Sequence, residues 1–131
     1  MDIQREHIER YLQEVYGTEA EHLWARYPEY AVFRHPISGK WYAIIMDVPK
    51  NKLGFAGEQP ISILNVKCSP LMIGSLLQEK GFLPAYRMSK ASWISICLDE
   101  SVSDEKIRFL VEMSYDCVAL KRKKKPRPEG D

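Results

Sequence analysis

Residues 81–99 read GFLPAYRMSKASWISICLD, and this stretch decides the fold. It predicts two strands, at 83–87 and 92–98, that are joined by a short turn. In the second strand Ile94 and Ile96 alternate with Trp93 and Ser95. Because strand side chains point alternately to the two faces of a sheet, this strand has one apolar face and one mixed face. We expect the isoleucines to lie against helices.

The same kind of pattern runs outward from this stretch along the chain. Alternating apolar residues predict strands at 30–35, 40–48 and 61–67, and the turn sequence HPISG makes a hairpin of the first two. Helices are predicted at 2–16, 70–80 and 103–121. Ser69 followed by Pro70, and Ser103, are the expected helix starts, and Gly81 is the expected stop of the second helix. The first helix should bury Ile8, Tyr11, Leu12 and Val15.

The order of these elements is helix, three strands, helix, two strands, helix. Strands that are joined by short turns pair antiparallel, and amphipathic helices cover the apolar face of a sheet. The sequence therefore predicts an α+β two-layer sandwich with the helices on one face of an antiparallel sheet. We expect the other face to be open.

The chain has 131 residues, 45% of them hydrophobic, which fits one domain with a real core. A basic, flexible tail is expected at 123–131. Residues 121–131 hold six lysines and arginines against two acidic residues, a net charge of +4, so residues 1–120 carry −3 of the total of +1. A protein that binds nucleic acid with its whole body is usually basic throughout.

Three cysteines, Cys68, Cys97 and Cys117, lie in or beside apolar segments and form no C-x-x-C pair. Their odd number and placement indicate buried free thiols in a reducing compartment. The N-terminus does not have the pattern of a signal peptide, and no apolar run reaches transmembrane length. We expect a cytoplasmic protein that does not bind membranes.

The sequence shows no pattern that is typical of catalysis or of cofactor binding. His7, His22 and His35 are scattered, with no second ligand at metal-binding spacing, so we expect no metal. Neither a P-loop nor a nucleophile elbow is present. We expect no cofactor, no catalytic residue and no enzymatic activity.

Basic residues and a tryptophan are the candidates for binding nucleic acid. Trp93 alternates opposite to the isoleucines, which would place it on the open face, where aromatic rings can stack on bases. Lysines and an arginine near the strand ends could contact phosphates, and the basic run near the C-terminus would attract any polyanion without specificity. The candidates are Lys40, Lys50, Lys52, Lys67, Arg87, Lys90, Trp93, Lys121, Arg122, Lys123, Lys124 and Lys125.

Several of these pieces together resemble the MmcQ/YjbR family of small bacterial proteins. The pieces are Tyr16-Gly17, AVFRHPISGKWYAII, LNVKCSP, PAYRMSKASWISICLD and Ser114-Tyr115, and the resemblance covers residues 1–122. It implies a fold that is grouped with CyaY-like and secretion-chaperone-like sandwiches. The family is often labelled DNA-binding, because its sheet is similar to the double wing of a phage transcription factor domain. Lys67, Tyr86, Lys90 and Trp93 match family positions, and the resemblance assigns them no role.

Three functions remain open at this point. The first is a nucleic-acid-binding module, with DNA bound weakly and without sequence specificity. The second is a protein-interaction or chaperone-like module that uses Trp41, Trp93 and apolar surface around them. The third is a small-ligand protein or enzyme with Lys67, Tyr86 and Lys90 around a pocket. The sequence does not indicate an oligomeric state.

Overall fold

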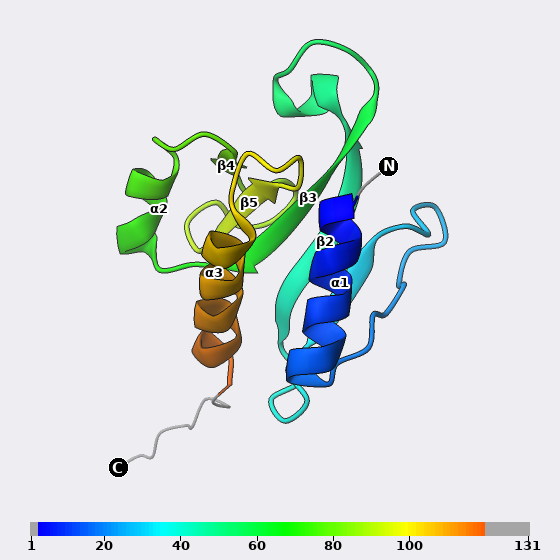
Figure 1. Ribbon diagram of the computed structural model, residues 1–131, viewed down its shortest axis with the longest axis vertical. Helices are drawn as coiled ribbons and strands as arrows, with labels where there is room; N and C mark the ends of the chain where they lie inside the picture. Colours follow the sequence, from blue (N-terminus) through cyan, green and yellow to red (C-terminus); the bar gives the residue numbers. More distant parts are fainter. Residues whose placement is uncertain (1–2, 120–131) are drawn as a thin grey trace.

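A computed structural model describes residues 3–119 and shows three helices over a five-stranded antiparallel sheet (Figure 1). The sheet has the strand order β1-β2-β3-β5-β4. The predicted α+β class and the predicted order of elements are confirmed. The elements are α1 (Ile3–Tyr16), β1 (Ala31–Arg34), β2 (Trp41–Pro49), the 3-10 helix η1 (Lys50–Leu53), β3 (Pro60–Lys67), α2 (Pro70–Leu76), β4 (Phe82–Pro84), β5 (Trp93–Cys97) and α3 (Asp104–Cys117).

Side-chain caps start two of the helices where the sequence predicts. The Ser69 hydroxyl accepts a hydrogen bond from the backbone N–H of Leu71 at 3.2 Å, and Pro70 occupies the first helical position. The Ser103 hydroxyl accepts from the N–H of Lys106 at 3.1 Å. Each cap satisfies an N–H that has no partner within its own helix.

Three predicted boundaries are wrong. The last helix ends at Cys117 rather than at residue 121. The second helix ends at Leu76 rather than at residue 80, so Gly81 does not directly follow it. Gly81 has a φ of +95°, and a Cβ at this position would lie 2.5 Å from Cγ2 of Val102, so a close approach of the backbone requires glycine here. The predicted strand 83–87 is Phe82–Pro84, because the chain turns away from the sheet at residue 85.

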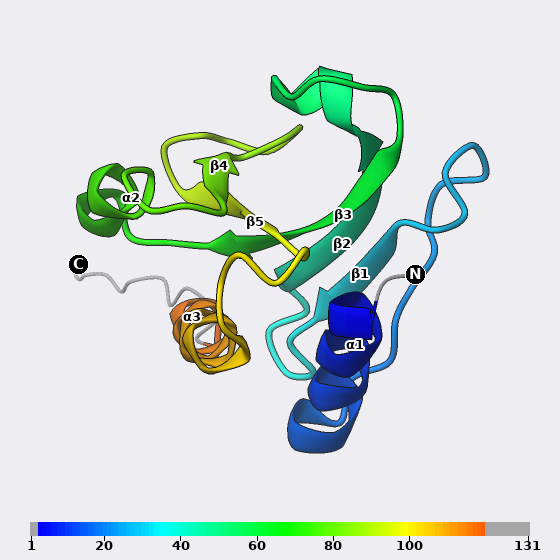
Figure 2. The ribbon, with the colours of Figure 1, turned by 45° about the horizontal axis from the view of Figure 1, so that its top comes forward.

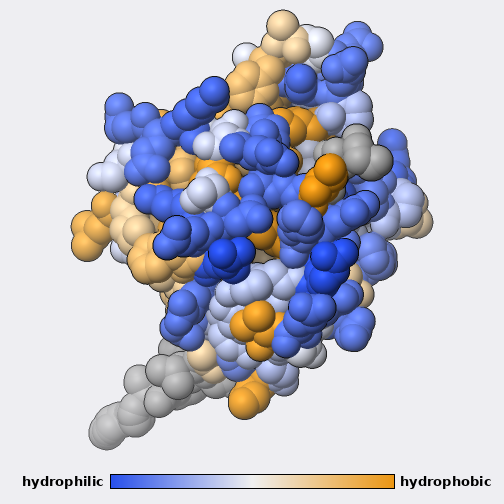
Figure 3. All heavy atoms as spheres, viewed as in Figure 1, coloured by the Kyte–Doolittle hydropathy of each residue, from blue (hydrophilic) through white to orange (hydrophobic). Residues whose placement is uncertain are grey.

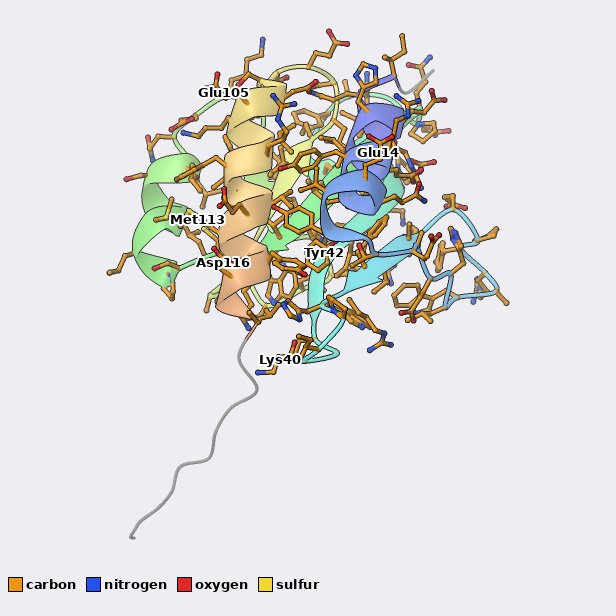
Figure 4. The ribbon with its side chains drawn as sticks, turned by 60° about the horizontal axis from the view of Figure 1, so that its bottom comes forward. Glu14, Lys40, Tyr42, Glu105, Met113 and Asp116 are labelled. Atoms are coloured by element: carbon orange, nitrogen blue, oxygen red, sulfur yellow. The ribbon has the colours of Figure 1, made fainter. Side chains whose placement is uncertain are left out.

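The main core lies between the helices and the sheet. Figure 2 shows α1 and α3 together on one side of the sheet. Ile94, Ile96, Leu110 and Val111 share one buried cluster, as the sequence predicts. Tyr42 also belongs to this cluster and lies between α1 and α3 in Figure 4.

The prediction that the first helix buries Val15 is wrong. Val15 is 56% exposed, whereas Ile8 and Leu12 are buried and Tyr11 is partly buried. Gln4 is buried on this helix as well, which the apolar pattern does not predict. Its amide donates to the carbonyl of Val102 at 3.0 Å and accepts from the N–H of Glu100 at 2.7 Å, which ties α1 to the segment before α3.

The opposite side of the sheet is not open. A second apolar cluster covers it, with segments 24–30 and 85–93 packed against the strands. Trp93 points to this side, as its alternation predicts, but only 8% of its surface is exposed. The buried members of this second cluster are Tyr30, Val32, Ile44, Met46, Val48, Ile63, Ala85 and Trp93. The partly buried residues that pack against them are Trp24, Tyr27, Trp41, Leu53, Tyr86 and Met88.

The helix side of the molecule has a mainly hydrophilic surface (Figure 3). Acidic side chains contribute to it from both long helices, including Glu14 on α1 and Glu105 and Asp116 on α3 (Figure 4). Within residues 3–119, no helix is long and apolar enough to cross a membrane.

Candidate binding site: a basic and aromatic face

A buried polar network fixes the segment after β4 to the side of the sheet opposite the helices. Ser95 on β5 and Asn65 on β3 face each other across the paired strands, and both are fully buried. The Ser95 hydroxyl donates to the Asn65 carbonyl oxygen and accepts from the N–H of Tyr86 at 2.9 Å. The Asn65 amide donates to the carbonyl of Tyr86 at 3.1 Å. The backbone of Tyr86 is therefore held at both its N–H and its carbonyl.

Arg87 follows directly and has a φ of +62°, which is unusual for any residue other than glycine. Its guanidinium carbon lies 5.4 Å from the ring centroid of Tyr86 and 5.7 Å from that of Tyr27. A backbone conformation of this kind persists only where the surrounding structure determines it. Here the fixed Tyr86 backbone places the exposed Arg87 side chain beside aromatic rings.

An aromatic hollow opens beside Arg87. It has a volume of about 460 Å³, which lies within the range of roughly 300–1,000 Å³ that is typical of small-ligand sites. Among residues 3–119, Arg87 is the one charged residue that lines it, and no carboxylate does. The lining residues are Trp24, Tyr27, Tyr30, Trp41, Ile44, Met46, Arg87 and Met88.

The rings of the aromatic hollow pack against one another in two ways. Trp24 meets Trp41 edge to face, with the ring centroids 6.0 Å apart and the planes at 80°. Tyr27 and Tyr30 are stacked, with the centroids 4.7 Å apart and the planes at 10°. Trp24 also contacts Tyr30 edge to face at 5.7 Å. These contacts hold the lining side chains in place before any ligand binds.

Tyr30 is the buried polar group of the aromatic hollow. Only 5% of its surface is exposed, and its hydroxyl has no hydrogen-bond partner anywhere in residues 3–119. Burial raises the pKa of this hydroxyl above its ordinary value of 10.0. A buried hydroxyl without a partner costs free energy, so it is a group that a ligand can satisfy.

A second hollow, of about 260 Å³, lies next along the chain. Tyr86 lines it together with Lys52 from η1 and Lys90, and its other lining residues are Leu53, Leu83, Pro84 and Ala85. The Lys90 ammonium group donates to the carbonyl of Ala85 at 2.9 Å. We call this second hollow the lysine hollow, and no carboxylate from the described part of the chain lines it.

The structure brings together four of the six described basic residues that the sequence proposes. Lys67 lies on the same side of the sheet as Arg87 and Lys90, with its ammonium nitrogen 5.7 Å from the ring centroid of Trp93. We call the resulting surface the basic–aromatic face. It consists of Lys52, Lys67, Arg87, Lys90, Trp24, Tyr27, Trp41 and Tyr86.

The other residues that the sequence proposes for nucleic-acid binding are not part of the basic–aromatic face. Lys40 is exposed beside the turn between β1 and β2, and Lys50 lines a hollow beside Gln4 on α1. The prediction that Trp93 is exposed on an open face is wrong, because only 8% of its surface is exposed and it belongs to the second apolar cluster. The basic run 121–125 lies outside the described residues.

Sequence reasoning named Trp41 and Tyr86 for other functions but missed the remaining aromatic residues of this face. Segment 18–29 reads as irregular, yet it supplies Trp24 and Tyr27, and Tyr30 follows at the same spacing of three. That run of evenly spaced aromatic residues is the signal that could have indicated the site. It is not a strand or helix pattern, so only the tertiary structure places it over β2.

The cysteines give no activated nucleophile. Burial raises the pKa of the Cys68 thiol despite the neighbouring Lys67, and it raises that of Cys97 to about 11. All three thiols are free, as predicted, but Cys117 is exposed rather than buried.

The YjbR family is the group of proteins to which this fold and sequence correspond. A sequence model described as YjbR matches residues 13–117. The chain therefore belongs to the YjbR family. Among curated relatives, it is 41% identical over 111 residues to a protein of Bacillus subtilis (strain 168) named "Uncharacterized protein YyaQ", a match that covers 85% of this chain and 94% of the relative.

Solved structures show the same fold. A crystal structure of a Pseudomonas syringae protein matches with a TM-score of 0.85 and 37% identity, covering 87% of this chain and 97% of that one. A solution NMR structure from the same organism matches with a TM-score of 0.81 and 35% identity, covering 94% and 98%. A Deinococcus radiodurans protein with a DUF419 domain shares the fold at a TM-score of 0.61 and 21% identity, covering 82% of this chain and 75% of its own.

Proposed function

We propose that this protein is a non-catalytic nucleic-acid-binding module that uses the basic–aromatic face. One observation carries the proposal: Tyr86 lines one hollow and its chain neighbour Arg87 lines another, and the described residues around the two hollows include three cations and no carboxylate. Phosphate groups need cations that carboxylates have not already neutralised, and bases need aromatic surface on which to stack.

The cations of this face are free to bind an anion. Arg5, Arg34 and Lys106 each pair with a carboxylate in the structure. Over residues 3–119, none of Lys52, Lys67, Arg87 and Lys90 has such an ion pair. A phosphate could therefore approach them without displacing a carboxylate.

The aromatic hollow favours single strands over duplexes. Base faces are stacked on one another inside a duplex, so a concave aromatic site can reach only a base that is unpaired and unstacked. The family's likeness to a double-wing sheet agrees with nucleic-acid binding, but it is an analogy between folds and does not carry the proposal.

The net charge of residues 3–119 favours a second candidate function, that of a protein-interaction module. Residues 3–119 contain thirteen lysines and arginines against fifteen aspartates and glutamates. A mildly acidic body repels polyanions at long range. Met46 and Met88 give the aromatic hollow adaptable apolar walls that could take a partner's side chain.

Charge removal with a matched control tests the proposal. The face variant combines Lys52→Gln, Arg87→Gln and Lys90→Gln, and the control combines Arg10→Gln, Lys80→Gln and Arg108→Gln, which are exposed elsewhere. Both variants lose three positive charges, so nonspecific attraction falls equally in both. Binding of a fluorescent single-stranded oligonucleotide is measured by anisotropy at low and moderate salt, and circular dichroism checks that each variant folds.

We expect the face variant to bind roughly tenfold more weakly than the control at low salt, because it loses phosphate contacts as well as net charge. Equal weakening in both variants would assign the binding to net charge alone. Absence of binding by the unmodified chain would leave the protein-interaction candidate.

A further inference from the structure

We infer that the aromatic hollow is a pocket for one unpaired nucleobase, with Arg87 at its rim for the phosphate of the same nucleotide. The inference rests on the proposed function and adds the ligand group and the residues that recognise it. The shape, the unpartnered polar groups and the charge of the hollow each support it.

The shape and lining of the hollow suit a flat ring. Four of its eight lining residues are aromatic, and Ile44 and Met46 supply buried apolar surface from β2. Aromatic pairs hold these walls in fixed orientations, with Tyr27 stacked on Tyr30 and Trp24 set against Trp41. A base could enter such a site and stack without first ordering its walls, which lowers the entropic cost of binding.

Three residues that line the hollow carry polar groups that no group in the described part of the chain satisfies. In the described part of the chain, the Tyr30 hydroxyl and the indole N–H groups of Trp24 and Trp41 have no hydrogen-bond partner. A partner protein's aliphatic side chain would leave all three unsatisfied. The edge of a nucleobase carries carbonyl and ring-nitrogen acceptors that can pair with such donors.

Arg87 places a positive charge beside the aromatic hollow, where it could meet the phosphate of a bound nucleotide. Arg87 is exposed, and its guanidinium lies over the rings of Tyr27 and Tyr86. The Asn65 and Ser95 network holds the neighbouring Tyr86 backbone, and Arg87 itself keeps a backbone φ of +62°. A planar guanidinium can bind a phosphate with two hydrogen bonds while it remains stacked on aromatic rings.

The same chemistry could come from a free nucleotide or from a nucleic-acid strand, and the probes distinguish the two. They are a short single-stranded oligothymidylate, a strand of the same length in which every nucleotide is abasic, and thymidine 5′-monophosphate. All three tryptophans of the chain, Trp24, Trp41 and Trp93, belong to this side of the sheet, so tryptophan fluorescence reports on the site.

We expect oligothymidylate to quench tryptophan fluorescence and to bind roughly tenfold more tightly than the abasic strand, the scale expected for one base–aromatic stack. Tyr30→Phe should weaken oligothymidylate binding about fivefold, the scale of one lost hydrogen bond. It should leave binding of the abasic strand unchanged. Tyr115→Phe is the control, because Tyr115 is a partly buried tyrosine that packs on the helix side.

Each outcome decides the matter. Quenching by thymidine 5′-monophosphate at an affinity close to that of the strand would identify a free nucleotide as the ligand, and quenching by the strand alone would identify nucleic acid. Equal binding of both strands, with no response to the mononucleotide, would overturn the base pocket but leave the proposed function standing. No binding of any probe would overturn both.

Discussion

The hydroxyl of Ser114 on α3 donates a hydrogen bond of 2.6 Å to the backbone carbonyl of Tyr42 on β2. The same hydroxyl accepts a hydrogen bond of 2.9 Å from the backbone N–H of Lys67 on β3. The regular pairing of these two strands reaches Ala43 opposite Val66 and stops there. Ser114 therefore bridges the next pair of backbone groups and joins the helix to the sheet.

Replacing Ser114 by alanine should lower the free energy of unfolding by about 2 kcal/mol. The change leaves a buried carbonyl and a backbone N–H without their partner, and each such group costs about 1–3 kcal/mol unless water reaches it. Urea unfolding followed by circular dichroism gives the value. Ser75→Ala, at an exposed position of α2, is the control and should change stability by less than about 0.5 kcal/mol.

Ile96→Ala should lower the free energy of unfolding by roughly 2–5 kcal/mol. Ile96 is fully buried between the central strands and the helices, so its truncation leaves a cavity. The same urea experiment measures the loss, and Ile37→Ala, at a position that is 81% exposed, is the comparison. A loss below about 1 kcal/mol would contradict the placement of Ile96 in the core.

The three thiols should react with a disulfide reagent at different rates. Cys117 is exposed, whereas Cys68 and Cys97 are buried and burial raises the pKa of each. Since the thiolate is the reactive form, we expect one fast thiol in the native protein and two that react only after unfolding. Cys117→Ser should remove the fast phase. A second fast equivalent would show that one of the other two is accessible.

Stability should fall between about pH 10 and about pH 12 through Tyr42. Burial raises the pKa of its hydroxyl from 10.0 to about 12, and a hydrogen bond with Thr18 at 2.5 Å partly opposes this rise. In this window the unfolded chain has lost the proton and the folded chain retains it, so rising pH favours unfolding. The stabilisation is complete below pH 10. Stability measured across this window should decline less steeply in Tyr42→Phe.

Truncation after Leu120 should flatten the salt dependence of nucleic-acid binding. Residues 121–127 hold six of the 19 lysines and arginines, and each cation on a phosphate releases counterions. For single strands the logarithmic slope should fall by about 0.7 for each phosphate contact that is lost. Titrations at two salt concentrations measure this. An unchanged slope would show that the basic run makes no phosphate contact.

Much of the fold follows from local patterns in the sequence. Alternation in residues 92–98 predicts β5 and places Ile94 and Ile96 against the helices, because the period of two allows only two faces. Ser69 and Ser103 mark helix starts, because a cap depends on neighbouring backbone groups alone. The residue at which a helix or strand ends depends also on contacts with residues far away in the sequence. Gly81 fits against Val102, and the helix before it is shorter than its sequence suggests.

The residues of the candidate site also fall into those that the sequence could indicate and those that it could not. Its cations, Arg87 and Lys90 among them, could be named from the sequence, since charged side chains beside strand ends are visible there. Trp41 could be named as well, but Trp24 and Tyr27 could not, because they come from an irregular segment that only tertiary packing brings over β2. The same packing buries Trp93, which the sequence alone leaves on an open face.

The sequence by itself determined the order of the elements, the antiparallel pairing, the inward faces of the strands and the family. The first three depend on residue periodicity and short-range backbone chemistry, and the family depends on the sequence motifs that this chain shares with it. Only the tertiary structure decided that loops cover the second face and that Gln4 and Ser114 are buried connectors. It also decided that the Tyr30 hydroxyl has no hydrogen-bond partner among residues 3–119. These features arise from contacts between residues far apart in the chain, whose geometry no local pattern encodes.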